Sequence, residues 1–273
     1  MTSVLKPQTS AVNAPLWGSR ARDWADLQEG QCRPVYLAAY ERLGLGADWT
    51  HLDVGCGAGM AAQLSAARRA SVWGLDATPR LLEIAQERVP SAEFLLGDLE
   101  ALPYPDDRFD LVTGFNSFQY AGNPGVALGE AKRVARPGGQ VLIMTWGEPE
   151  AVEAASLIWA LGPLIWALGP LMPPPPPGAP GPFALSDEAA LRAFAAGAGL
   201  EPLEVFDVPS PWHYPDRATA LRAQMSSGVA ARAVSHSGVE GVQAAYGRAL
   251  EPYRQPDGSY TIGASFRCLT ARA

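Results

Sequence analysis

His51-Leu-Asp-Val-Gly-Cys-Gly-Ala-Gly59 is the stretch of sequence that decides the fold. The run Thr50–Val54 is apolar and β-rich, whereas residues 58–69 have helical spacing, so the glycines mark a turn from a strand into a helix. Glycine lets the backbone turn sharply and approach a ligand closely because it has no Cβ. The start of the helix directs free N–H groups toward an anion, and a cofactor carboxylate would suit that position. The sequence therefore predicts a cofactor-binding loop at residues 53–59.

A dinucleotide is the alternative ligand for such a loop. Its fingerprint, G-x-G-x-x-G, requires glycine at position 60, where this chain has Met60. Asp53, two residues before the first glycine, is an unfavourable neighbour for a pyrophosphate but a good acceptor for an ammonium group. The charge therefore favours a cofactor that carries an amino acid.

Short apolar runs alternate with helical patterns through residues 50–145. Strands are predicted at residues 50–54, 71–75, 93–96, 109–115 and 140–145, and helices at residues 58–69, 79–88 and 124–135. Pro137-Gly138-Gly139 should separate the last helix from the last strand. Strands separated by helices form parallel βαβ units with right-handed crossovers. We therefore expect an α/β, doubly wound, Rossmann-like sheet, mostly parallel, with helices on both faces.

Four regions are expected along the chain. An N-terminal helical arm (1–48), with helices on either side of Pro34, precedes a core (49–147) that binds the cofactor. An apolar, proline-rich lid or linker (148–185) follows. Residues 186–273 should complete the sheet, with strands at 203–208 and 259–271 and a helical cap inserted at about 215–255, before the last strand. Ser186 should cap a helix that runs to about Ala198.

Residues 157–163 and 164–170 are identical copies of Leu-Ile-Trp-Ala-Leu-Gly-Pro, and five prolines follow at 173–177. A duplicated segment packed on the domain, a lid over a lipophilic substrate, and a contact with a partner or membrane are the interpretations left open.

Composition restricts the classes of partner. The net charge of −7 opposes binding to a phosphate backbone, so nucleic acid is not an expected substrate. Three widely separated cysteines indicate neither a disulfide framework nor a metal site. The start of the chain lacks an apolar signal segment, and the most apolar stretch is too short for a spanning helix, so a cytoplasmic location without stable membrane insertion is expected. A homodimer is compatible with the sequence.

Two further carboxylates follow predicted strands. Asp76 ends the second strand about 20 residues after the first glycine, where it can accept hydrogen bonds from ribose hydroxyls. Gly97-Asp98-Leu99 closes the third strand, where the acid can accept from an adenine amino group. A helix cap at Asp76 and a turn without a ligand at Asp98 are the alternatives.

Four elements together resemble the class I S-adenosylmethionine-dependent methyltransferases. These are the loop at 53–59, Asp76, Gly97-Asp98 with Leu102-Pro103 and Phe109-Asp110, and Arg136-Pro137-Gly138-Gly139. The resemblance runs from about Thr50 to Trp146. The last two elements are similar to the small-molecule branch (methyltransferase type 11-like) that includes ubiquinone and menaquinone biosynthesis C-methyltransferases.

The resemblance implies S-adenosylmethionine as cofactor and methyl transfer to a small, apolar or aromatic metabolite. A protein that binds this cofactor without methyl transfer, as a regulator or a non-methylating enzyme, is the alternative. An NAD-dependent oxidoreductase is the third hypothesis. The implied cofactor-binding residues are Asp53, Gly55, Cys56, Gly57, Gly59, Asp76, Ala77, Gly97, Asp98, Leu99, Phe115, Asn116 and Ser117.

Methyl transfer from a sulfonium is an in-line displacement, so it depends mainly on alignment. Aromatic faces favour the sulfonium charge, and Trp17, Trp24, Phe115, Phe118 and Tyr120 are near the inferred cleft. The sequence does not assign the catalytic residues. The candidates are His213, Tyr214 and His236 in the cap, and Asn116 and Gln119 after the fourth strand of the sheet.

Overall fold

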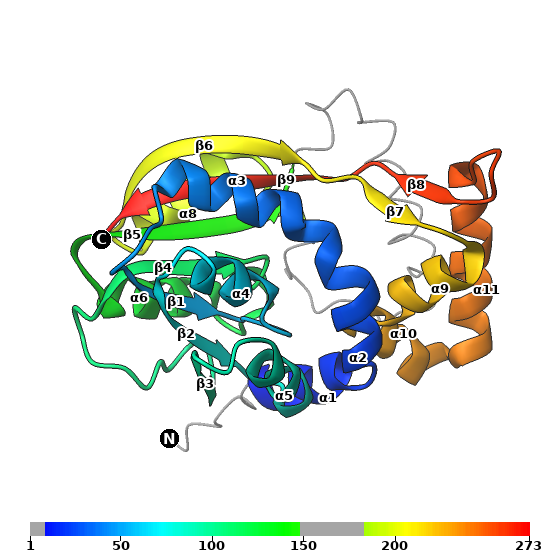
Figure 1. Ribbon diagram of the computed structural model, residues 1–273, viewed down its shortest axis with the longest axis horizontal. Helices are drawn as coiled ribbons and strands as arrows, with labels where there is room; N and C mark the ends of the chain where they lie inside the picture. Colours follow the sequence, from blue (N-terminus) through cyan, green and yellow to red (C-terminus); the bar gives the residue numbers. More distant parts are fainter. Residues whose placement is uncertain (1–8, 148–182) are drawn as a thin grey trace, which may run out of the picture.

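A seven-stranded sheet runs through the computed structural model, which describes residues 9–147 and 183–273 (Figure 1). Its strand order is β3-β2-β1-β4-β5-β9-β6. The strands are β1 (Thr50–Val54), β2 (Ser71–Asp76), β3 (Glu93–Leu96), β4 (Phe109–Phe115), β5 (Ala135–Trp146), β6 (Glu201–Pro209) and β9 (Ser265–Arg272). Strands β1 to β5 pair in parallel, and β9 is antiparallel to both β5 and β6. The sheet is therefore mostly parallel.

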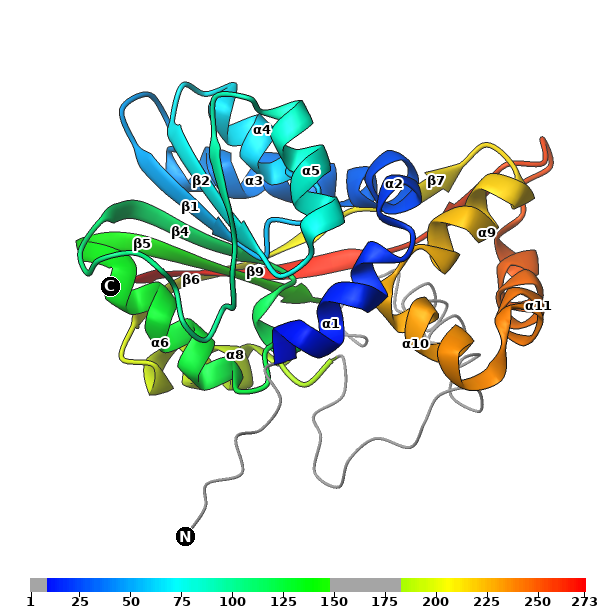
Figure 2. The same cartoon turned by 90° about the horizontal axis from the view of Figure 1, so that it is seen from below.

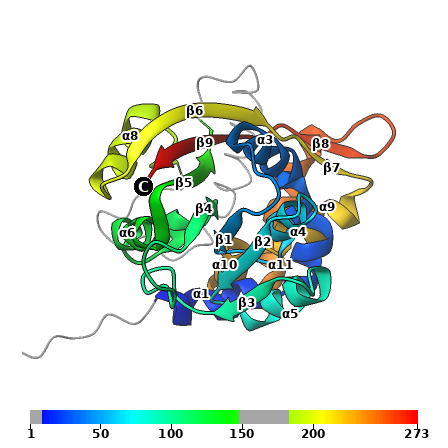
Figure 3. The ribbon, with the colours of Figure 1, turned by 60° about the vertical axis from the view of Figure 1, so that its left-hand side comes forward.

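Helices cover both faces of this sheet, as Figures 2 and 3 show. One face carries α3 (Arg33–Leu43), α4 (Met60–Ala66) and α5 (Pro79–Arg88), and the other carries α6 (Pro124–Val134) and α8 (Glu188–Gly197). Successive residues of β4 belong to the two hydrophobic cores: Leu111 is in the buried cluster that includes Tyr40 of α3, and Val112 is in the one that includes Leu128 of α6. The predicted doubly wound fold is confirmed.

An arm of helices precedes the sheet and lies at the end where the parallel strands stop (Figure 1). It consists of α1 (Thr9–Gly18), α2 (Ala21–Asp23), the π-helix η1 (Trp24–Gln28) and the 3₁₀ helix η2 (Glu29–Cys32), and it leads into α3 on the face of the sheet. Pro34 stands in the first turn of α3, where its missing N–H costs no hydrogen bond.

A helical cap stands at the same end of the molecule. It contains α9 (Arg217–Met225), α10 (Gly228–Ser237), α11 (Val239–Leu250) and η5 (Glu251–Tyr253), and all of them precede β9 as predicted. Asp216 and Ser227 cap α9 and α10 by accepting backbone N–H bonds from Thr219 and Ala230. Within residues 9–147 and 183–273, no helix combines the length and the apolar composition needed to span a bilayer.

Local boundaries were predicted well in the core and less well near the end of the chain. The predicted bounds of β1, α5, β3 and β4 are those of the structure, whereas α4 is shorter than residues 58–69. The predicted break at Pro137-Gly138-Gly139 is wrong: β5 begins at Ala135, where it pairs with Phe109, so these residues lie inside the strand. The predicted cap Ser186 is wrong: the Asp187 carboxylate accepts the Ala190 N–H at 2.7 Å, and the Ser186 hydroxyl is buried without a partner. The predicted strand at 259–271 is two strands, β8 (Tyr260–Ile262), which pairs with β7 (Trp212–Tyr214), and β9. The duplicated segment and the proline run lie outside the described residues.

Candidate functional site

The glycine loop joins β1 to α4 next to the point where the strand order reverses, between β1 and β4. Ligands of open α/β sheets bind at such switch points. Gly55 has φ +74°, and a Cβ there would lie 2.4 Å from the Cβ of Ser117. The loop can therefore pack directly on the segment that follows β4. Gly57 has φ +55° and faces the cleft.

A cleft at this end of the sheet brings together most of the predicted cofactor residues. Its lining includes Gly55, Gly57, Asp76, Ala77, Asp98, Leu99, Phe115, Asn116 and Ser117. These residues come from the glycine loop, the end of β2, the turn after β3 and the end of β4. Parallel strands expose their carboxyl ends on one edge, so four separate sequence elements meet in one cavity.

The other predicted cofactor residues do not line this cleft. Asp53 is buried and accepts the Thr113 hydroxyl at 2.7 Å, and burial raises its pKa to about 7. Cys56 is buried, and its sulfur lies 2.9 Å from where a Cβ on Gly74 would stand. Gly59 lies against Ala85 of α5, and Gly97 lies against Leu75. The expectation that Asp53 faces an ammonium group is not met by this geometry.

Asp76 and Asp98 present acceptors to the cleft from neighbouring strand ends. Asp76 Oδ2 accepts the Gly57 N–H at 2.9 Å, and Oδ1 accepts the Thr78 N–H at 2.8 Å. Burial raises the pKa of Asp76, while these backbone hydrogen bonds act in the opposite direction. Asp98 Oδ1 accepts the Glu100 N–H at 2.9 Å. The Thr78 hydroxyl and the Ala77 N–H also act on the Asp76 carboxylate, whereas Asp98 keeps more of the four or so acceptor sites of a carboxylate for a ligand.

The arm closes the cleft from the other side. Asn13 donates to the Tyr120 carbonyl at 3.0 Å, and Trp17 meets Trp24 and Tyr120 edge-on at 4.9 and 5.7 Å. Of the aromatic residues expected near the cleft, Trp17, Trp24, Phe115 and Tyr120 line it, whereas Phe118 is buried. Sequence reasoning missed seven lining residues: Asn13, Cys32, Tyr36, Thr78, Leu81, Ala121 and Met144.

Glu29 of the arm occupies the start of α4. Its Oε1 accepts the Met60 N–H at 3.3 Å, and its Oε2 pairs with the Arg88 guanidinium. Glu29 is 4% exposed, and burial raises its pKa. The expected place for a cofactor carboxylate, at this helix start, is therefore filled by a side chain of the protein.

The catalytic candidates separate into two groups. Asn116, at φ +56°, lines the cleft, and its side-chain oxygen accepts the Gln119 amide. His213 is exposed and contacts Thr261, whereas Tyr214 is buried and its hydroxyl donates to Gln28 at 2.7 Å. His236 is exposed near the end of α10. None of these three cap residues lines the cleft.

The chemistry of the lining is acidic and aromatic. Among the described lining residues there is no Lys, Arg or His, and the carboxylates are those of Asp76 and Asp98. Burial raises the pKa of the Cys32 thiol to about 12 and raises that of the Tyr36 phenol. Neither group loses its proton near neutral pH, so the cleft suits a cationic, hydrogen-bonding ligand.

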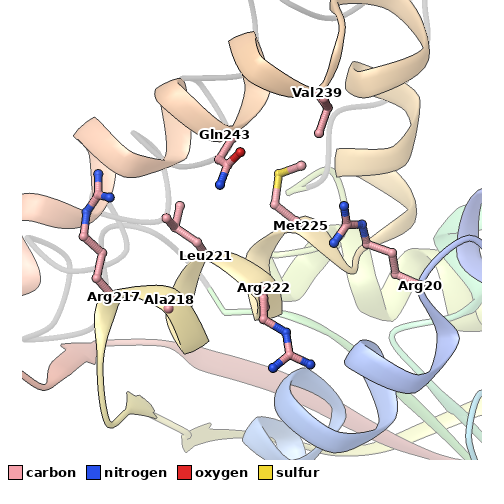
Figure 4. Close-up of a pocket in the computed structure, with 8 residues that line it drawn as sticks. All are labelled: Arg20, Arg217, Ala218, Leu221, Arg222, Met225, Val239 and Gln243. Carbon is pink, nitrogen blue, oxygen red and sulfur yellow. The ribbon is translucent and has the colours of Figure 1, made fainter.

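A second pocket lies between α9, α11 and the arm (Figure 4). It is lined by Arg20, Arg217, Ala218, Leu221, Arg222, Met225, Val239 and Gln243. The arginines already have acidic partners: Asp23 lies 2.5 Å from Arg222 and 3.7 Å from Arg20, and Glu251 lies 3.2 Å from Arg217. No predicted site residue borders this pocket.

Comparisons with known proteins agree with this geometry. Residues 52–143 match the model of a family described as a methyltransferase domain, so the predicted resemblance is confirmed for this segment. A malonyl-[acyl-carrier protein] O-methyltransferase of Serratia marcescens is 37% identical over 94 residues, 34% of this chain and 37% of the relative. A demethylmenaquinone methyltransferase of Renibacterium salmoninarum is 31% identical over 123 residues, 45% of this chain and 52% of the relative. The chain thus spans between about a third and a half of these curated relatives.

A solved structure, that of the 4+2 cyclase SpnF, has a TM-score of 0.60 at 22% identity and covers 97% of both chains. At this identity the likeness shows the fold, including the arm and the cap, and nothing about the reaction.

Proposed function

We propose that this chain is an S-adenosylmethionine-dependent methyltransferase that acts on a small, apolar or aromatic metabolite. The observation that carries the proposal is the convergence of Gly57, Asp76 and Asp98 on one cleft, inside a segment that matches a methyltransferase domain. The three residues follow three consecutive strands of the core, β1, β2 and β3.

The donor and acceptor groups of the cleft fit this cofactor. Asp98 can accept from the adenine amino group and Asp76 from the ribose hydroxyls. The sulfonium charge would lie among aromatic rings that stabilise a cation, including Trp24, Tyr36 and Phe115. A dinucleotide fits less well, because its pyrophosphate would meet two carboxylates and no cationic side chain among the described lining residues.

When bound, the cofactor supplies a methyl group on a positively charged sulfur, which an acceptor atom attacks in line. The protein's part is to hold the acceptor at near-contact distance and in the correct direction. Asn116 stands at the end of β4, and Gln119 fixes its side-chain amide, so Asn116 can orient a polar group of the acceptor. Asn116 cannot remove a proton, so in the described part of the cleft the residues favour an acceptor that is already nucleophilic.

The acceptor end of the cleft is apolar. Cys32, Tyr36, Phe115 and Met144 line it between the arm and the ends of β4 and β5. A hydrophobic wall with a few polar groups is typical of sites for small molecules. This lining supports an apolar or aromatic acceptor.

A second candidate is a protein that binds S-adenosylmethionine without transferring the methyl group. One fold can serve several reactions, and a structure whose fold resembles 97% of this chain is called a cyclase, not a methyltransferase. Turnover separates the two candidates. With methyl-labelled cofactor and a metabolite extract, a methyltransferase releases labelled product over many turnovers, whereas the second candidate gives only stoichiometric binding.

Calorimetry tests the ligand itself. Titration with S-adenosylhomocysteine should show one site per chain, and titration with NAD should show none. Preferential binding of NAD would overturn the proposal in favour of an oxidoreductase.

A further inference from the structure

The space beside Gly57 is bounded by two side chains of the arm. A Cβ at Gly57 would lie 3.8 Å from Trp24 Nε1 and 3.5 Å from Glu29 Oε1. Any other residue at this position would therefore fill the hollow between an N–H donor and a carboxylate acceptor. The hollow opens on the cleft, because Gly57 and Trp24 both line it.

The π-helix of the arm places both side chains at this hollow. The N–H of Glu29 bonds to the carbonyl of Trp24, five residues earlier, which is one turn of a π-helix. Residues five apart in an α-helix lie about 140° apart around the axis and face different directions. The wider turn brings Trp24 and Glu29 to the same side. Such turns are rare and recur at functional sites.

Trp24 and Glu29 differ in how many hydrogen-bond partners they already have within the protein. Within the described residues, the indole N–H of Trp24 has no hydrogen-bond acceptor. Glu29 Oε1 accepts the Met60 N–H, Oε2 is held by Arg88, and the Ala58 N–H is a third donor to this carboxylate. A carboxylate has about four acceptor sites, so Glu29 can accept one further hydrogen bond.

We infer that Trp24 and Glu29 recognise the α-amino-acid end of the cofactor, with the Trp24 N–H donating to its carboxylate and Glu29 Oε1 accepting from its ammonium group. The inference rests on the proposed function. One donor and one acceptor on either side of a glycine complement a zwitterion, and the Arg88 charge balances that of Glu29. The arm therefore does more than cover the cleft: it selects a ligand that carries an amino acid.

A ligand that lacks the amino acid provides the test. S-adenosylhomocysteine and 5′-methylthioadenosine share the adenosine and the thioether, but only the first carries the amino-acid group. Trp24→Phe keeps an aromatic ring and removes the N–H. Its affinity for S-adenosylhomocysteine, measured by calorimetry, should fall about 10- to 100-fold, as expected for a hydrogen bond to a charged group. Its affinity for 5′-methylthioadenosine should stay the same.

Trp73→Phe is the matched control, because it removes an indole N–H outside the cleft, one that donates to Glu93 at 3.0 Å. It should leave both affinities unchanged. Glu29→Gln, with folding checked by circular dichroism, should also weaken binding of S-adenosylhomocysteine alone, and it provides the test if Trp24→Phe does not fold. Equal effects on both ligands, or no effect on either, would overturn the inference. Failure of the unaltered protein to bind either ligand would instead defeat the proposed function, and this inference with it.

Discussion

The backbone N–H of Gly57 donates a 2.9 Å hydrogen bond to Oδ2 of Asp76, which ties the glycine loop to the end of β2. The Thr78 N–H holds the other oxygen at 2.8 Å, so both oxygens are fixed before a ligand arrives. A positioned carboxylate loses little side-chain freedom on binding, which favours affinity.

Replacing Asp76 by Ala should weaken binding of S-adenosylhomocysteine by about 1.5–3 kcal/mol, the range for hydrogen bonds to a charged group. Binding of 5′-methylthioadenosine should weaken equally, because both ligands carry the ribose. Calorimetry measures both affinities. Asp106→Ala, in an exposed loop, is the control and should change neither. Unchanged affinity in the Asp76 variant would remove the ribose assignment.

Gly55→Ala should destabilise the fold by about 1–3 kcal/mol through overpacking alone, because the new Cβ would lie 2.4 Å from that of Ser117. The positive φ of Gly55 adds strain. Gly129→Ala, in the middle of α6 with nothing within 4 Å of the new Cβ, should instead stabilise by about 0.5–1 kcal/mol. Urea unfolding measures both changes, and similar values for the two variants would contradict the packing role of Gly55.

His51 should make the protein less stable in mild acid. Its ring is fully buried between Ser65 at 2.9 Å and Thr113 at 2.8 Å, and burial lowers its pKa from 6.5 to about 3. The unfolded chain therefore takes up a proton below pH 6.5 that the folded chain refuses. From this group alone, stability should fall by roughly 2 kcal/mol between pH 8 and pH 5.

Asp53 titrates with the opposite sign, because its pKa is raised to about 7 in the folded state. The stability that Asp53 contributes to the folded state is present at acid pH and is lost as the pH rises through 7. The effects of His51 and Asp53 on stability overlap between pH 4 and 7. The effect of His51 is therefore measured as the difference in unfolding free energy between the unaltered protein and His51→Asn. A difference that does not vary with pH would refute the prediction for His51.

Arg88→Met should destabilise the protein by about 3–5 kcal/mol, because it leaves the carboxylate of Glu29 buried without its partner. Adding Glu29→Gln should recover part of this loss, since the buried charge is then gone. Arg22→Met is the control: Arg22 also links the arm to α5, but it pairs with Glu87 at 3.0 Å on the surface and should cost at most about 1 kcal/mol. Additive losses in the Arg88 and Glu29 double variant would show that the pair is not coupled.

The core of the fold follows from local sequence signals. Strand and helix periodicities lead to the right elements from Thr50 to Trp146, and the glycines of the loop reveal the turn between β1 and α4. Asp76 and Asp98 could be placed at the cleft because each stands at the end of a predicted parallel strand. The location of the cleft was therefore predictable from the order of the elements.

The arm's part in the site was not predictable in the same way. Glu29 bonds Met60, 31 positions later, and Arg88, 59 positions later, and no periodic pattern records such contacts. The π-helix is equally hidden, because the spacing of apolar residues there suggests an ordinary helix. Asp53 shows the reverse error: its place before the glycines suggested a ligand, but its side chain points into the sheet layer, toward Thr113.

The strand order carries a consequence for how the chain acquires its structure during synthesis. Strand β9 is the last strand in sequence, yet it lies between β5 and β6 and is the only neighbour that joins β6 to the rest of the sheet among the described residues. Until residues 265–272 have left the ribosome, β5 presents an open edge and β6 has no place to pair. Open edges invite pairing with other chains. Closure of the sheet therefore waits until β9 has been synthesised.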